Sequence, residues 1–122
     1  MSEIKRITPE KVLTAFKATG LVPIQDDWFG ITDGKKCACG LSAVQVAQAE
    51  NTDSGFNDIS RAEDIEEFIS KSMELEYEYL RGFVYGFDGS SLSDRADDNF
   101  KLGWKDGYDS WQKVKHMAGD RD

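Results

Sequence analysis

The sequence predicts a mainly α protein, a small single-domain helical bundle of about four helices with a long antiparallel helical hairpin at its C-terminal end. Apolar residues recur at helical spacing over long stretches, capping residues precede several of these stretches, and two segments share a Gly-x-x-x-Gly motif. The 122 residues fit one domain. We expect its core to span about residues 7–117 and its tail, residues 118–122, to be frayed.

The composition places the chain among globular proteins. With 39% hydrophobic and 31% charged residues, it is too apolar for a disordered protein and too polar for a membrane protein. No apolar run approaches the roughly 18 residues that a membrane span needs. Residues 1–11 have no apolar stretch of the kind a signal peptide requires. We therefore expect a soluble, cytoplasmic protein that does not bind membranes.

The first helix is predicted over residues 9–19. Thr8 can accept hydrogen bonds from free amides at the helix start, and Pro9 suits the first helical position. Gly20 is a natural left-handed stop. These three signals define both ends of the helix.

The stretch after this helix is predicted to be extended over residues 21–24, because Pro23 disfavours a helical residue before it. In residues 24–36, Asp33 and Gly34 form a hairpin-type turn signal. The sequence leaves two alternatives for this stretch. It forms either a short β-hairpin or an irregular loop that closes one end of the core.

The middle of the chain predicts two helices. The first covers residues 41–50 and is followed by a polar connector over 51–57. Ser60 and Glu63 form a capping box, which places the start of a long helix there. The apolar residues of this helix continue at helical spacing over residues 61–87.

The last helix is predicted over residues 94–117, because charged side chains at both ends complement the helix dipole. Its first turn holds Asp94, Asp97 and Asp98, and its last turn holds Lys113, Lys115 and His116.

A repeated pattern links the last two predicted helices. Residues 79–89 and 100–110 both read aromatic-x-x-Gly-aromatic-x-x-Gly-aromatic-Asp. The four glycines are Gly82, Gly86, Gly103 and Gly107. Each costs roughly 1 kcal/mol in a helix, so a close helix–helix contact is expected to compensate. An antiparallel hairpin would pair them symmetrically. The alternative is a groove for a small planar ligand, in which the glycines leave space and the aromatic rings stack on the ligand.

Acidic residues are concentrated in residues 50–78, where ten acids and two bases give a net charge of −8, the same as that of the whole chain. The sequence has no strongly basic patch, which argues against direct nucleic-acid binding. An acidic surface instead favours docking to a basic partner. The candidate interaction residues are Trp28, Phe29, Glu63, Asp64, Glu66, Glu67, Glu74 and Glu78.

The leading functional hypothesis is therefore a non-catalytic protein–protein interaction module that meets an unknown protein partner through the acidic face or through the aromatic residues near Trp28 and Phe29. A basic protein is one candidate partner. A second copy of the chain, giving a homodimer, is another. A more specific version of this hypothesis is an inhibitor that mimics the negative charge of nucleic acid.

Two further sets of residues carry potential chemistry. Cys37 and Cys39 precede a predicted helix start, where a thiol can react as a thiolate or bind a metal. A candidate cation site consists of Asp88, Asp94, Asp97 and Asp98, although these residues lack the order of an EF-hand. No hydrolase or metalloprotease motif is present. We therefore expect no catalytic residues and no cofactor.

Overall fold

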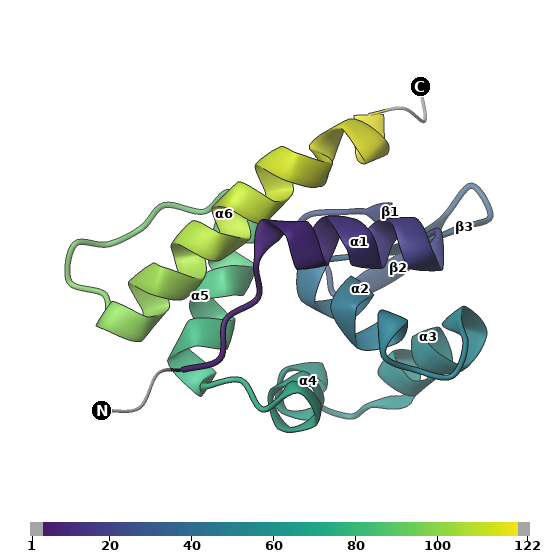
Figure 1. Ribbon diagram of the computed structural model, residues 1–122, viewed down its shortest axis with the longest axis horizontal. Helices are drawn as coiled ribbons and strands as arrows, with labels where there is room; N and C mark the ends of the chain where they lie inside the picture. Colours follow the sequence, from purple (N-terminus) through teal and green to yellow (C-terminus); the bar gives the residue numbers. More distant parts are fainter. Residues whose placement is uncertain (1–3, 120–122) are drawn as a thin grey trace.

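The computed structural model describes residues 4–119, and this range has six helices and a small three-stranded sheet. The elements are α1 (Pro9–Thr19), β1 (Val22–Pro23), β2 (Phe29–Thr32), β3 (Lys35–Ala38), α2 (Gly40–Ala47), α3 (Thr52–Arg61), α4 (Ile65–Met73), α5 (Tyr77–Phe87) and α6 (Asp98–Gly119). The sheet lies beside α1 and α2 at one side of the molecule (Figure 1). The mainly α class is confirmed, but the predicted four helices are six. None of the described helices combines the length and the apolarity that crossing a membrane would take.

Helix α1 has the predicted bounds and the predicted caps. The Thr8 side chain accepts from the backbone N–H of Lys11, and Gly20 ends the helix with a φ of 74°.

The sheet order is β1-β3-β2, with β2 and β3 antiparallel and β1 parallel to β3. Asp33 and Gly34 both have positive φ, as a two-residue hairpin turn requires. Of the two alternatives for this stretch, the hairpin is therefore the observed one.

The predicted polar connector at 51–57 is wrong, because helix α3 begins there. The Asn51 side chain accepts from the N–H of Ser54 at 2.8 Å and starts the helix. The predicted capping box is also wrong, since Ser60 lies within α3. Asp64 caps the following helix instead, accepting from the N–H of Glu67 at 3.1 Å.

The predicted long helix over residues 61–87 is broken into α4 and α5. Glu74 ends α4 in a left-handed conformation, with a φ of 56°. Leu75 is then buried, and the Glu76 side chain caps α5. The apolar spacing continues across the break, so periodicity alone does not reveal it.

Helix α6 begins at Asp98 rather than at residue 94. The Asp97 side chain accepts from the N–H of Asn99 at 2.8 Å, so only the last part of the predicted acidic first turn caps this helix. Helix α6 extends to Gly119, and residues 120–122 of the predicted frayed tail lie outside the described residues.

Helices α5 and α6 pack in parallel, not as the predicted antiparallel hairpin. An added Cβ at Gly82 would meet the carbonyl oxygen of Phe100, and one at Gly86 would meet that of Trp104. Four residues further along α5 toward its C-terminus, the contact on α6 is also four residues nearer the C-terminus, so the two helices run in the same direction. Figure 1 shows both helices rising in the same direction, with residues 88–97 returning the chain between them.

The contact is equally close from the side of α6. An added Cβ at Gly103 would meet the carbonyl oxygen of Tyr79, and one at Gly107 would meet that of Phe83. All four distances are well under the 3.0 Å that real Cβ atoms respect. Only a glycine hydrogen fits in these places, so the two backbones touch and each glycine Cα–H faces a carbonyl oxygen.

A buried polar network ties the N-terminal segment to this helix pair. Arg6 donates two hydrogen bonds to the carboxylate of Asp106 on α6, at 2.9 and 2.8 Å. The hydroxyl of Tyr79 donates to the same carboxylate at 2.5 Å and accepts from the N–H of Ile7 at 2.8 Å. Burial and the Asp106 carboxylate raise the pKa of Tyr79, so the phenol stays protonated as this network requires.

The substitution Gly86→Ala should destabilise the protein by roughly 3 kcal/mol, even though alanine is the better helix former by about 1 kcal/mol. The added methyl group would force apart two backbones that cannot yield locally. Denaturant unfolding measures this change. Gly30→Ala is the control, because its Cβ would meet only Ile24 Cδ1 at 3.9 Å. Equal stability of the two variants would contradict the close-contact description.

The substitution Asp106→Ala should cost about 3 kcal/mol, because it leaves the buried Tyr79 hydroxyl without its acceptor and removes the partner of Arg6. Asp109→Ala on the same helix is the matched control. It removes only a solvent-exposed pair with Lys105, for which we expect a loss below about 1 kcal/mol. Thermal unfolding compares the two, and a loss in Asp106→Ala no larger than in the control would refute the network's role.

Candidate functional site

Three exposed tyrosines and three half-buried side chains, two of them aromatic and one an arginine, form a surface on the outer side of α5 and α6. We call it the aromatic–arginine surface. It consists of Tyr77, Arg81 and Tyr85 on α5 and of Phe100, Trp104 and Tyr108 on α6. In each helix the members lie four residues apart, so they share one face.

Ring contacts join these side chains to one another. Tyr85 and Phe100 meet edge to face with ring centroids 5.4 Å apart, which links the two helices. The guanidinium carbon of Arg81 lies 5.8, 5.7 and 5.9 Å from the ring centroids of Tyr77, Tyr85 and Phe100. These distances allow cation–π attraction, so three rings hold the arginine in place.

The second half of the surface is a stacked pair. The rings of Trp104 and Tyr108 lie 5.1 Å apart and 9° from parallel. The indole N–H of Trp104 donates to the carbonyl oxygen of Ser90 at 2.8 Å, which fastens the connector between α5 and α6. This half is therefore also held by fixed contacts.

The surface remains open to solvent. The exposed fractions of Tyr77, Tyr85 and Tyr108 are 51%, 42% and 40%. A shallow hollow of about 280 Å³ lies next to Arg81. Its lining residues are Glu78, Arg81, Tyr85, Ser91, Ser93, Ala96, Asp97 and Phe100. The arrangement can bind a partner, but it presents no nucleophile paired with a base.

Four of the six acidic interaction candidates, Glu63, Asp64, Glu66 and Glu67, lie together around the start of α4. Glu63, Asp64 and Glu67 line one groove on α4. Glu74 is exposed at the left-handed end of that helix. The remaining two, Glu66 and Glu78, are half-buried, and Glu78 lies 3.9 Å from Arg81.

The two aromatic interaction candidates, Trp28 and Phe29, are half-buried rather than exposed. Phe29 packs edge to face on Phe56 with ring centroids 5.6 Å apart. Trp28 packs against the core and lines a small hollow. Neither is therefore available as a prominent anchor, in contrast to the α5 and α6 tyrosines.

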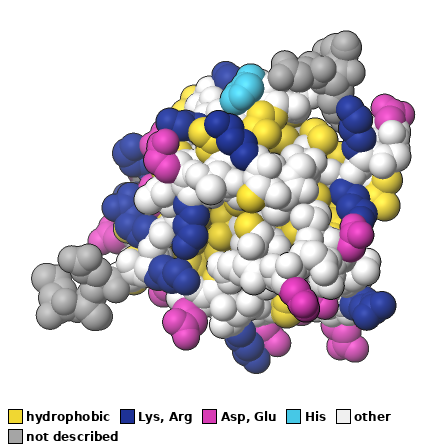
Figure 2. All heavy atoms as spheres, turned by 45° about the vertical axis from the view of Figure 1, so that its right-hand side comes forward, with side chains coloured by type: hydrophobic (Ala, Val, Ile, Leu, Met, Phe, Trp, Pro, Cys, Tyr) yellow, Lys and Arg dark blue, Asp and Glu magenta, His cyan; other side chains and the backbone are white. Residues whose placement is uncertain are grey.

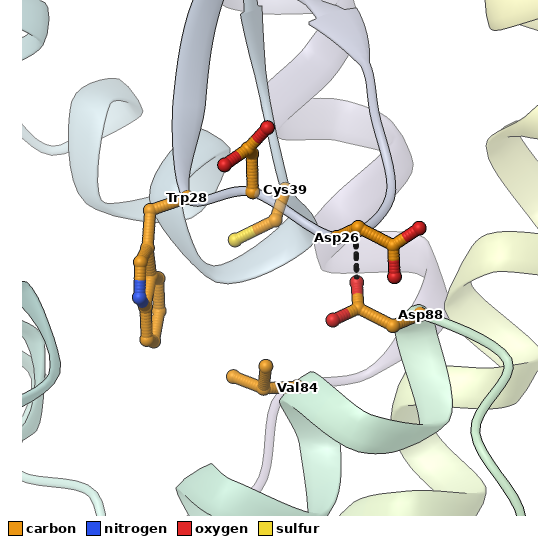
Figure 3. Close-up of a pocket in the computed structure, with 6 residues that line it drawn as sticks. Asp26, Trp28, Cys39, Val84 and Asp88 are labelled. Atoms are coloured by element: carbon orange, nitrogen blue, oxygen red, sulfur yellow. Dashed lines mark hydrogen bonds between the residues drawn. The ribbon is translucent and has the colours of Figure 1, made fainter.

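That small hollow, of about 60 Å³, is lined by Asp26, Asp27, Trp28, Cys39, Val84 and Asp88. Figure 3 shows Asp88 reaching the backbone of Asp26, whose N–H donates to the carboxylate at 2.8 Å, and the Cys39 sulfur directed into the hollow. Both candidate cysteines are buried and unbridged. Burial raises the pKa of the Cys39 thiol, which is opposite to what a reactive thiolate needs.

The candidate cation ligands lie in different local environments. Asp88 ends α5, Asp94 lies in the connector, Asp97 caps α6 and Asp98 begins it. Over residues 4–119 no group of three or more histidine, cysteine or carboxylate side chains is placed to hold a metal ion.

The aromatic–arginine surface was missed by sequence reasoning, which assigned the aromatic residues of the repeat to the helix contact. Spacing carries the signal that could have found it. Tyr79, Phe83 and Phe87 are four residues apart and buried, so Tyr77 and Tyr85 must project from another face.

The pKa of Asp88 is raised, first by burial and then by the neighbouring Asp26 and Asp27 carboxylates. The folded state therefore favours the protonated form. Protonated Asp88 therefore adds to the stability of the folded state. This gain is fully present at acidic pH, below the ordinary pKa of the carboxyl, and it is lost as the pH rises through the raised pKa of Asp88. Asp88→Asn keeps an acceptor for the Asp26 N–H without the charge. It should make the protein more stable at pH 7 and give no gain at pH 3.

Denaturant unfolding of both forms at these two pH values measures the effect. Asp94→Asn, an exposed change in the connector, is the control and should be neutral at both. A destabilised Asp88→Asn at pH 7 would show that the charge is needed there.

The chain matches no protein-family model, no curated protein and no solved structure.

Proposed function

We propose that this protein is a non-catalytic protein–protein interaction module that binds its partner through the aromatic–arginine surface. One observation carries the proposal. Three tyrosines with exposed fractions of 40% or more lie on the outer side of α5 and α6, together with an arginine held between rings. Tyrosine, tryptophan and arginine are the residues most enriched among those that dominate binding energy at protein interfaces.

The surface is also rigid in a way that favours binding. Arg81 is held by three rings, and Trp104 by its hydrogen bond to Ser90 and by stacking on Tyr108. Side chains that are already ordered lose less conformational entropy when a partner binds. The burial of their large apolar faces then contributes to affinity with only a small opposing loss of conformational entropy.

The alternatives have less support from the geometry. A planar ligand between the glycines would need space that the touching backbones of α5 and α6 fill. A thiol-dependent activity would need an accessible thiolate, whereas Cys37 and Cys39 are both buried. The partner is therefore best described as a protein, with a second copy of the chain as one version.

Photo-crosslinking tests the proposal. A photoreactive phenylalanine analogue replaces Tyr85 in one variant and Thr14, an exposed residue of α1, in the other. In the native cell extract, the Tyr85 position should give one discrete adduct and the Thr14 position should not. Adding Arg81→Ala should reduce the Tyr85 adduct by at least about tenfold, as loss of a hot-spot residue does.

The mass of the adduct identifies the partner, and an adduct of twice the chain mass would show self-association. Circular dichroism of each variant confirms that the fold is kept. No adduct from Tyr85, or the same adducts from both positions, would refute this surface as the interaction site.

A further inference from the structure

A groove runs along one face of α4, next to the Tyr77 end of the aromatic–arginine surface. We call it the α4 groove. It is lined by Ala62, Glu63, Asp64, Glu67, Phe68, Lys71 and Ser72, and its volume is about 550 Å³. The five lining residues that follow Glu63 have the i, i+3, i+4, i+7, i+8 spacing of a single helix face.

The groove has an apolar floor. Phe68 packs partly against the core but remains half-buried. The opposite face of α4 holds the helix to the protein through the buried Ile69 and Met73. Because a helix bonds its own backbone groups internally, this face offers a partner side chains only and no strand edge.

The rim of the groove is negatively charged. Glu63, Asp64 and Glu67 face one cation, Lys71, which lies 3.5 Å from Glu67. The surrounding segment, residues 50–78, carries the net charge of −8 noted above. In Figure 2 several acidic side chains lie along the lower edge of the molecule, interspersed with basic ones, on the side where Figure 1 places α3 and α4.

We infer that the α4 groove binds a basic amphipathic helix of a partner protein. Its apolar side chains, one helical turn apart, would pack on Phe68, and its Lys or Arg side chains would pair with Glu63, Asp64 and Glu67. Charge complementarity selects this class of partner over an acidic or neutral one. The inference does not depend on the aromatic–arginine surface, which lies on α5 and α6.

The probe is a synthetic Leu/Lys amphipathic peptide of about 18 residues, long enough to form a helix on binding. Its affinity is measured by fluorescence anisotropy at low salt, beside an oligolysine of equal charge. The double variant Glu63→Lys/Glu67→Lys reverses two exposed charges of the groove. It should weaken peptide binding by at least about tenfold.

The matched control is Glu50→Lys/Asp58→Lys, which changes the net charge equally at two exposed residues of the same acidic segment outside the groove. It should weaken binding by less than about threefold, through long-range charge alone. Equal losses in the two double variants would overturn the inference, as would oligolysine binding as tightly as the peptide, or no peptide binding by the native protein.

The variant Tyr85→Ala separates this test from that of the proposed function. Peptide binding should be unchanged in it, because Tyr85 lies outside the groove. Loss of binding in Tyr85→Ala would place the peptide on the aromatic–arginine surface and refute the groove. A negative crosslinking result at Tyr85, in contrast, would leave peptide binding at α4 intact.

Discussion

The backbone contact between α5 and α6 is the constraint on which the rest of the structure depends. Four glycines let the two helices touch, and each gives up roughly 1 kcal/mol of helix propensity to do so. The close approach fixes the position of α6, and with it Asp106, which binds the N-terminal segment through Arg6. The ends of the chain are thereby joined to the centre of the fold.

The parallel direction of the pair also creates the candidate interaction surface. Because α5 and α6 are parallel, the residues of the aromatic–arginine surface on the two helices lie on the same side of the pair. The rings of Tyr85 on α5 and Phe100 on α6 are therefore in contact. The glycine face and the aromatic face belong to the same two helices but point in different directions. Substitutions on the aromatic face therefore leave the glycine contact that holds the two helices together unchanged.

Local signals predicted the fold where local chemistry decides it. Thr8, Pro9 and Gly20 define α1, and Asp33 with Gly34 defines the hairpin turn. The direction of α6 could not be predicted, because a pair of glycines four residues apart matches a second such pair in either direction. The break at Glu74 could not be predicted either. The left-handed conformation of Glu74 costs about 1 kcal/mol or more, and the burial of Leu75 offsets this cost.

The acidic segment, residues 50–78, likewise combines a property that the sequence predicts with one that only the tertiary structure determines. Its charge was evident in the sequence, but the groove depends on the packing of α4, which buries Ile69 and Met73 and leaves Phe68 half-buried. The two surfaces meet where Glu66 of α4 raises the pKa of Tyr77 on α5 through hydrogen bonding. A change at this boundary would disturb both. Tyr85 and Glu63 do not line the hollow at this boundary, so a substitution at either position changes one surface only.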